Sequence, residues 1–157
     1  MEVFKDFYQN EVKYVIGNEA FSKTPKHVWV ICKYENQWLL TKHKDRGIEF
    51  PGGKVEEGET AEEAAIREVM EETGGHIQSI RFVGQYYVDG KGGDIVKNVY
   101  FAEVDKLIEQ KHYFETEGPV LLDELPNNIK QQKQFSFMMK DDILTFSIRE
   151  LRKRKWI

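Results

Sequence analysis

Residues 52–75 read GGKVEEGETAEEAAIREVMEETGG, a glycine-rich stretch that runs directly into a helical one. Thr60 and Glu63 have the spacing of a capping box, strong helix formers follow as far as Glu72, and Gly74 supplies a stop signal. The sequence therefore predicts a helix from Thr60 to Glu72, fed by a loop.

The predicted helix carries three glutamates close together. At about 100° per residue, Glu68, Glu71 and Glu72 fall within an arc of roughly 100°. A separate apolar arc is made by Ala65, Ile66 and Val69. Like charges three and four residues apart repel by a few tenths of a kcal/mol per pair. A hard divalent cation such as magnesium or manganese would relieve this repulsion; the alternative is a solvated acidic face with Arg67 as a loose counterion.

The loop that feeds the helix favours the first interpretation. Residues 45–59, DRGIEFPGGKVEEGE, contain four glycines and one proline. This composition is typical of a backbone that turns sharply or comes close to another group. A glycine-rich loop ahead of a helix leaves room for phosphates, or for a backbone carbonyl to reach a metal ion.

The spacing across loop and helix resembles a known signature. Gly53, Glu59, the run Arg67-Glu68-Val69, Glu71-Glu72 and Gly74 fall on the Nudix box, G-x5-E-x7-R-E-U-x-E-E-x-G-U. Every charged and glycine position is filled, and seven matches at fixed spacing make coincidence negligible. The box covers residues 53–75, and flanking F-P-G-G and L-L-D-E-L-P motifs are similar to those of the MutT-like branch.

The resemblance implies a role for each box residue. Magnesium, with manganese as a possible substitute, would be held by the side chains of Glu68, Glu71 and Glu72. Gly52 would contribute its backbone carbonyl. Arg67 would orient the carboxylates, and Glu59 would support the loop and the metal-bound water. Gly53 and Lys54 are the loop residues expected to meet the substrate. The family hydrolyses nucleoside diphosphates linked to a further group, so the substrate is expected to be a small nucleotide with a polyphosphate.

One position departs from the signature. The last position of the box is aliphatic in the family and is Gly75 here. That residue packs in the family and does not bind metal, so the departure concerns local packing, with Ile77 as a candidate for compensation.

A further carboxylate from a loop often serves the family as general base. Glu115 and Glu117, in YFETEGPVLL, are the candidates, and Glu115 is favoured. A glutamate of the box remains an alternative base, and so does a plain surface role for Glu115.

Base recognition rests on a different segment. Asp141 and Asp142 open the last predicted helix, where oxidised-purine triphosphatases carry an Asp-Asp pair that reads the base edge. The alternative is that Asp141 is only a helix N-cap. Trp29, Phe21 and Tyr86 could stack on a base, although single aromatics in strands more often belong to the core.

Three functions follow. The first is a MutT-like hydrolase of oxidised or ordinary nucleoside triphosphates, including 8-oxo-dGTP, that releases monophosphate and pyrophosphate. The second is removal of pyrophosphate from a triphosphorylated RNA 5′ end, with RELRKRK (149–155) in contact with phosphates. The third is a non-catalytic nucleotide-binding module, which intact box glutamates argue against.

The rest of the chain predicts a mixed α/β (α+β) fold, with a mixed β-sheet between helices. Strands are expected as two hairpins, residues 26–34 with 36–43 and residues 77–88 with 94–104, and as one short strand in GPVLLDELP (118–126) that ends at Pro126. A second helix is expected from Asp141. We expect one domain over residues 1–157.

Composition sets the remaining expectations. A net charge of −4 indicates no general nucleic-acid binder, and the single cysteine, Cys32, excludes an internal disulfide and fits a reducing compartment. No segment has the length and hydrophobicity of a membrane span, so we expect a cytoplasmic protein. No obligate protein partner is indicated, and the four histidines have no metal-ligand spacing and receive no role.

Overall fold

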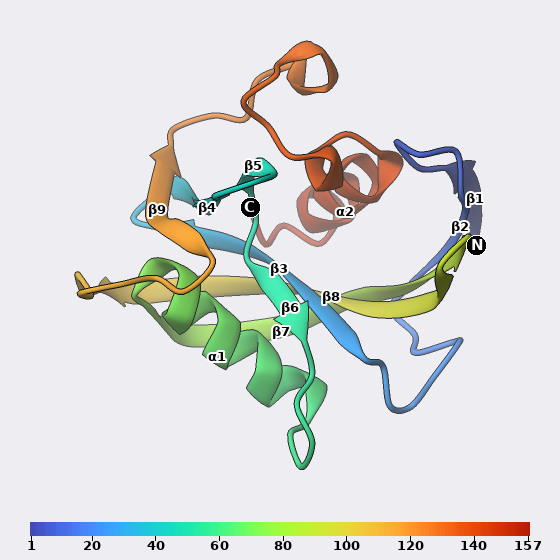
Figure 1. The fold of residues 1–157 in the computed structure, drawn as a ribbon, viewed down its shortest axis with the longest axis horizontal. Helices are drawn as coiled ribbons and strands as arrows, with labels where there is room; N and C mark the ends of the chain where they lie inside the picture. Colours follow the sequence, from blue (N-terminus) through green and yellow to red (C-terminus); the bar gives the residue numbers. More distant parts are fainter.

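The computed structural model describes all 157 residues, which form one nine-stranded sheet, two α-helices and two short 3-10 helices (Figure 1). The strands are β1 (Glu2–Lys5), β2 (Glu11–Ile16), β3 (His27–Tyr34), β4 (Gln37–His43), β5 (Gly47–Glu49), β6 (Gly52–Lys54), β7 (Gly75–Gly90), β8 (Gly93–Leu107) and β9 (Thr116–Leu122). The helices are α1 (Ala61–Thr73), η1 (Ile129–Gln131), η2 (Phe137–Met139) and α2 (Asp142–Lys153).

The sheet is mixed. Its main path runs β1-β2-β7-β8-β3-β4-β5, while β6 pairs with β3 and β9 pairs with β4. The β3 and β8 strands run parallel, and the other pairs are antiparallel. The mixed sheet and the two helices confirm the predicted fold class.

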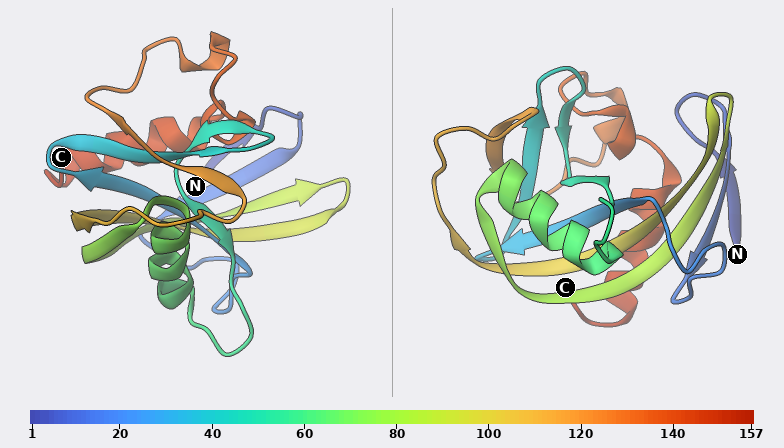
Figure 2. Two further views of the ribbon diagram at one scale, coloured as in Figure 1. Left: turned by 60° about the vertical axis from the view of Figure 1, so that its left-hand side comes forward. Right: turned by 60° about the horizontal axis from the view of Figure 1, so that its bottom comes forward.

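The two α-helices cover opposite faces of the sheet (Figure 2). Successive side chains of a strand point to opposite faces, and β3 is apolar on both. Its Val28, Val30 and Cys32 pack with α1, whereas Trp29 and Ile31 pack in the larger core under α2. Continuous apolar runs such as β3 therefore mark the strands that are buried on both sides.

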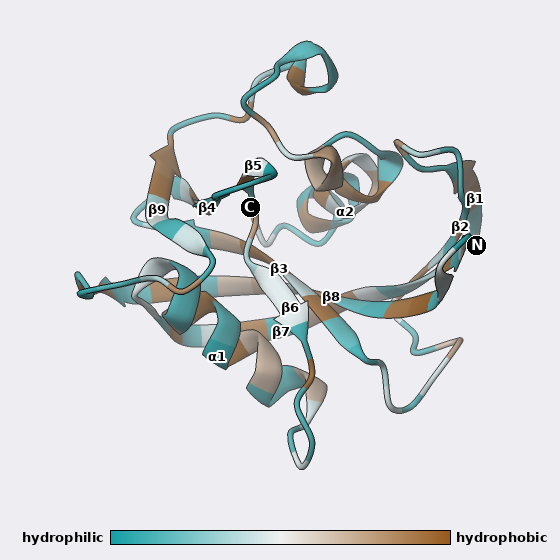
Figure 3. Ribbon diagram, in the orientation of Figure 1, coloured by the Kyte–Doolittle hydropathy of each residue, from teal (hydrophilic) through white to brown (hydrophobic).

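Hydrophobic residues are concentrated on the strands and the inner helix faces, and the loops are mainly hydrophilic (Figure 3). Along α1, the buried apolar residues are Ala64, Ala65 and Val69. Ile66, which was expected in the apolar arc, is instead exposed. Ala64 takes its place on the buried face. No helix has both the length and the hydrophobicity that a membrane crossing requires.

Both predicted hairpins and the third predicted strand are present, and α1 and α2 begin within one residue of their expected starts. One expectation here was wrong: residues 45–59 were expected to be loop, but they contain β5 and β6, each only three residues long. The N-terminal strands β1 and β2 were missed; β2 is held in the sheet by pairing with β7.

The packing around Gly75 accounts for the departure from the signature at this position. A Cβ atom at this position would lie 2.9 Å from the hydroxyl of Thr73 and 3.2 Å from methyl groups of Val69 and Val104. The space that an aliphatic side chain would need is already filled by these neighbours. Ile77, two residues later, packs against the α1 side of the core.

Candidate active site

The glycine-rich loop lies directly against the carboxylate helix. A Cβ atom at Gly52 would lie 2.4 Å from the carbonyl oxygen of Val28, and one at Gly53 would lie 2.6 Å from the carboxyl carbon of Glu68. At Gly52 the contact is with the backbone of β3, so glycine is required there. At Gly53 the contact is with the end of a side chain, so any larger residue would displace the carboxylate of Glu68.

Local signals fix both ends of α1. Thr60 accepts a hydrogen bond from the backbone N–H of Glu63, whose side chain accepts one from the N–H of Thr60, so the predicted capping box is present. Gly74 ends the helix in a left-handed conformation, with φ +78°. The three glutamates of the last two turns are thus held on a helix with defined ends.

Glu72 is the most deeply placed of the three glutamates, with only 6% of its surface exposed. Its Oε1 accepts a 3.0 Å hydrogen bond from the N–H of Gly52. The hydroxyl groups of Thr41 and Thr116 both donate to its backbone carbonyl, at 3.0 and 3.1 Å. Two strands and the glycine loop therefore hold this glutamate in place.

Arg67 lies at the centre of the carboxylate cluster. Its guanidinium donates to both oxygens of Glu59, at 2.7 and 2.9 Å, and to Glu68 and Glu71, at 2.7 and 3.2 Å. It also donates to the backbone carbonyl of Lys54, at 3.0 Å. One arginine thus ties the loop to the helix and gathers three of the predicted carboxylates.

Crowding and burial favour the protonated form of two glutamates. Burial raises the pKa of Glu68 to about 7; Arg67 opposes this shift, while Glu71 and Glu115 add to it. Burial also raises the pKa of Glu72 to about 8, with Glu68 contributing, against the hydrogen bond from Gly52. The site is short of positive charge, as expected where a cation binds.

The donor set fits a hard divalent cation. Its potential ligands are all oxygens, the type that magnesium and manganese prefer. As the side chains stand, no three of them converge in a ligand arrangement, because Glu68 and Glu71 turn toward Arg67. A cation would compete with Arg67 for these oxygens, and the absence of a side chain at Gly53 lets the Glu68 carboxylate lie directly against β6.

Of the two candidate loop carboxylates, only Glu115 faces the cluster. Glu117 pairs with Lys42 at 3.6 Å on the surface. The Oε2 of Glu115 lies 3.8 Å from Nε2 of His43, and its charge reaches Glu68 and Arg46. Glu115 is therefore kept as the candidate base, and this role stays a prediction.

A hollow of about 670 Å³ opens between the β1–β2 turn, the β7–β8 hairpin and η2. Its apolar walls include Tyr86, Val88 and Met138, and its polar groups include Asn10, Lys97 and Asp141. An apolar hollow with a few polar groups suits a flat, partly polar ligand such as a nucleobase. Neither Trp29 nor Phe21 lines it, and Trp29 belongs to the core.

The predicted Asp-Asp pair divides between two environments. Asp141 lines the hollow and also caps α2, accepting a 2.9 Å hydrogen bond from the N–H of Ile143. Burial raises its pKa to about 6, although Lys97 opposes the shift. Asp142 does not line the hollow and instead contacts Lys130 at 3.3 Å. Only Asp141 is placed to meet a base.

Lys97 is a functional candidate that the sequence analysis missed. Burial lowers its pKa to about 8, while the carboxylates of Glu49 and Asp141 oppose this shift. Arg46 binds Glu49 through two hydrogen bonds, of 2.9 and 2.8 Å, and Glu49 also influences Glu72. Lys97 lines the hollow, and the charge of Glu49 acts both on Lys97 and on Glu72 of the carboxylate cluster. It shares a strand face with Val99, and a lysine at a core-facing position was the signal that could have revealed it.

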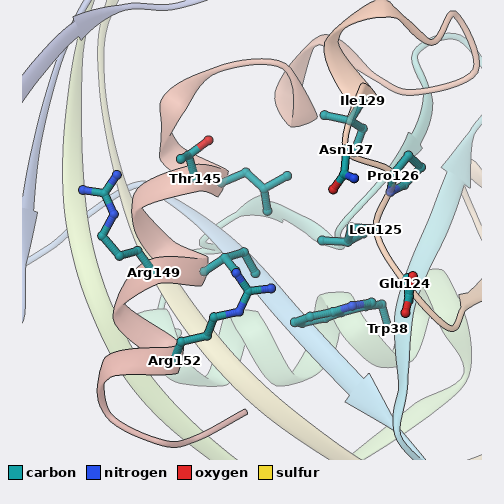
Figure 4. Close-up of a pocket in the computed structure, with 11 residues that line it drawn as sticks. Trp38, Glu124, Leu125, Pro126, Asn127, Ile129, Thr145, Arg149 and Arg152 are labelled. Carbon is teal, nitrogen blue, oxygen red and sulfur yellow. The ribbon is translucent and has the colours of Figure 1, made fainter.

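Another hollow, of about 690 Å³, lies between α2 and the segment after β9 (Figure 4). Arg152 extends across it toward Trp38, whereas Arg149 points to the other side of the helix. Of the residues expected to contact substrate, only Arg149 and Arg152, from the basic segment 149–155, line this hollow. It is separate from the carboxylate cluster.

Comparisons with known proteins identify the family of the chain. Residues 23–139 match the NUDIX domain family. The chain is 56% identical to the protein YtkD of Bacillus subtilis (strain 168), provisionally named an 8-oxo-dGTP diphosphatase, over 100% of this chain and 99% of that protein. The crystal structure of the Bacillus subtilis pyrophosphohydrolase BsRppH, an E68A mutant, matches with a TM-score of 0.99 and 55% identity, covering 100% of this chain and 99% of that one. A NUDIX hydrolase from Nitrosomonas europaea shares the fold, with a TM-score of 0.66 and 19% identity over 85% of this chain and 91% of that one.

Proposed function

The chain belongs to the Nudix hydrolase family, and we propose that it is a magnesium-dependent pyrophosphohydrolase of nucleoside 5′-triphosphates. Its substrates include oxidised purine deoxynucleotides such as 8-oxo-dGTP, and its products are the nucleoside monophosphate and pyrophosphate. The observation that carries this proposal is the carboxylate cluster of α1 beside the glycine loop, together with a hollow of the right character for a base that Lys97 and Asp141 line.

Magnesium, or manganese in its place, would be held by Glu68, Glu71, Glu72 and the carbonyl of Gly52. When bound, it supplies positive charge to the phosphates and the departing pyrophosphate, and it lowers the pKa of the attacking water. Arg67 then holds Glu59 and the loop, as it does in the structure.

The protein side chains supply the remaining chemistry. Asp141 and the apolar walls of the hollow bind the base. Lys97 donates a hydrogen bond to a phosphate oxygen where the triphosphate of the substrate extends toward α1. Water attacks one of the two phosphorus atoms joined by the α–β anhydride bond, and that bond breaks. Glu115 accepts the proton of the water as general base.

A substrate panel with magnesium tests the proposal. It contains canonical and oxidised triphosphates, ADP-ribose, dinucleoside polyphosphates and a triphosphorylated RNA, with the products separated by charge. Monophosphate and pyrophosphate from a free triphosphate support the proposal, and hydrolysis of ADP-ribose alone contradicts it. Binding without any turnover would favour a non-catalytic nucleotide-binding module instead.

A second candidate is the same reaction at the 5′ end of a triphosphorylated RNA. The observation that favours it is the end of α2, where RELRKRK contributes five basic residues. Among them, only Arg154 pairs with a carboxylate, that of Glu150 at 3.4 Å. Arg152 borders the hollow of Figure 4, with Trp38 across from it. Unpaired cations beside an aromatic ring suit a single strand.

The two candidates differ in their salt dependence. Phosphate contacts along a strand release counterions, so affinity for RNA falls steeply with salt. Arg152→Ala should weaken turnover of RNA and leave turnover of a free triphosphate unchanged if the second candidate holds. Equal effects on both substrates would count against it. We place either activity in the cytoplasm, where the single buried Cys32 stays reduced.

A further inference from the structure

His43, at the end of β4, is buried, and its ring is fixed by the turn that follows. Its Nδ1 accepts hydrogen bonds from the backbone N–H groups of Asp45 and Arg46, at 3.1 and 3.2 Å. A nitrogen that accepts two N–H donors carries no proton. The neutral ring must therefore carry its proton on Nε2.

The protonated Nε2 faces one carboxylate. The Oε2 of Glu115 lies 3.8 Å away, and 85% of the Glu115 side chain is otherwise exposed. A separation of 3.8 Å is longer than a hydrogen bond, but catalytic contacts are often long before the substrate binds. Rotation of the exposed carboxylate is enough to close the gap.

The same turn also holds the backbone beside Glu115. The N–H of Lys44 donates to the carbonyl of Glu115 at 3.2 Å, and the Lys44 ammonium donates to the carbonyl of Phe114 at 3.1 Å. Phe114 adopts a left-handed conformation, φ +62°, which a non-glycine residue keeps only where its surroundings hold it. The loop is therefore positioned by residues 43 and 44 together.

These contacts bring the loop to the carboxylate helix. Thr116, next to Glu115, donates to the backbone carbonyl of Glu72, as Thr41 of β4 does. The end of β4 is thus the common support of α1 and of the loop that carries Glu115.

We propose that His43 is a positioning residue: its Nε2–H orients the carboxylate of Glu115 toward the glutamates of α1. This inference rests on the proposed function, in which Glu115 accepts the proton of the attacking water. In this role His43 transfers no proton; it restricts the rotation of an exposed side chain, which otherwise samples many conformations.

Two substitutions of His43 distinguish the roles of its two ring nitrogens. In His43→Asn, the amide oxygen replaces Nδ1 as the acceptor for the turn, but nothing reaches Glu115. In His43→Gln, the longer amide places an N–H near the position of Nε2 but serves the turn less well. We expect His43→Asn to keep a melting temperature near that of the wild type and to lower kcat about tenfold. We expect His43→Gln to have a lower melting temperature than the wild type and a kcat within about threefold of the wild-type value.

The crossed pattern is what a merely structural histidine cannot produce. If kcat follows the melting temperature in both variants, or if His43→Asn keeps full kcat, the proposal is overturned. In a Glu115→Gln background, His43→Asn should lower kcat no further, because both changes act on one group. If the losses of kcat from the two substitutions multiply in the double variant, the proposal is also overturned.

A measurement without substrate completes the test. Long-range proton–nitrogen NMR spectra of the imidazoles, with the His43 signals assigned by their loss in His43→Asn, should show an unprotonated Nδ1 and a protonated Nε2. Glu115→Gln should shift the Nε2 signal. An unchanged Nε2 signal overturns the inference, even for a protein that hydrolyses none of the panel substrates; total inactivity of the wild type with the expected spectra contradicts the proposed function only.

Discussion

Gly52 and Glu72 are twenty residues apart in the chain, yet the N–H of Gly52 donates a 3.0 Å hydrogen bond to the carboxylate of Glu72. The neighbouring Gly53 has no room for a Cβ atom because the carboxylate of Glu68 fills that space. Loop and helix thus form one unit, in which the position of the backbone of β6 sets the position of two carboxylates.

Gly53→Ala should therefore impair catalysis more than folding. Its Cβ atom would lie 2.6 Å from the carboxyl carbon of Glu68, so this side chain must move. Displacement of a catalytic group by about 1 Å can cost on the order of a hundredfold in rate. We expect a loss of kcat on that scale, measured as pyrophosphate release. Gly58→Ala is the control: its left-handed φ of +81° strains the backbone, but no atom lies within 4 Å, so stability falls while kcat is kept. Equal kcat losses in the two variants would contradict the argument.

Removal of divalent cations should lower stability most at high pH. The pKa of Glu68 is raised to about 7 and that of Glu72 to about 8, from an ordinary value of 4.5, mainly by burial. Because the folded state holds these protons more tightly than the unfolded chain, their contribution is complete below about pH 4.5 and is lost as the pH rises through 7 and 8. Melting temperatures in EDTA should fall between pH 5.5 and 8.

Magnesium should oppose this fall, because it binds the ionised carboxylates. We expect the difference in melting temperature with and without magnesium to grow from pH 5.5 to pH 8, by roughly 4 °C or more. The control is Glu72→Gln, which removes one of the two titrating groups and should flatten the profile in EDTA. A magnesium effect that does not change with pH would contradict the prediction.

Asp141→Asn should change the choice of base without destabilising α2. Asparagine is as good an N-cap as aspartate, so the melting temperature should hold. The ionised carboxylate accepts N–H donors of a purine edge, and the amide replaces one acceptor by a donor. We expect the ratio of kcat/KM between oxidised and ordinary purines to change about tenfold or more, because an unpaired buried polar group costs about 1–3 kcal/mol. Asp142→Asn is the matched control, since Asp142 contacts Lys130 outside the hollow. An unchanged ratio in Asp141→Asn would remove this residue from base recognition.

The sequence predicted the parts of the molecule that local chemistry determines. The bounds of α1 follow from the Thr60 capping box and the Gly74 stop, and both are formed by residues within one or two turns of the helix end. The carboxylates of α1 could be placed together for the same reason. The strand β2 was missed because it depends on pairing with β7, about seventy residues later, which no local pattern reveals.

His43 and Lys97 were missed for a related reason. His43 is an ordinary histidine at the end of a strand until the β4–β5 turn donates two N–H groups to its ring. Lys97 becomes informative only when β7, β8 and the start of α2 enclose it with Asp141. The role of a side chain at the junction of distant segments is set by packing, whereas a spacing motif records only residues on one segment.

Lys97 offers the sharpest test of the path between the base and the carboxylates. Its pKa is lowered to about 8, mainly by burial, so the ammonium is mostly charged at pH 7 and loses its charge as the pH rises above 8. If it donates to a phosphate, KM for a triphosphate should rise above pH 8. Lys97→Met should raise KM about tenfold at pH 7, because a hydrogen bond to a charged group contributes about 1.5–3 kcal/mol, and should abolish the increase above pH 8. Lys97→Arg, which keeps its charge at every pH used, should hold KM low at pH 9. A Lys97→Met enzyme with wild-type KM would show that the phosphates do not pass this residue.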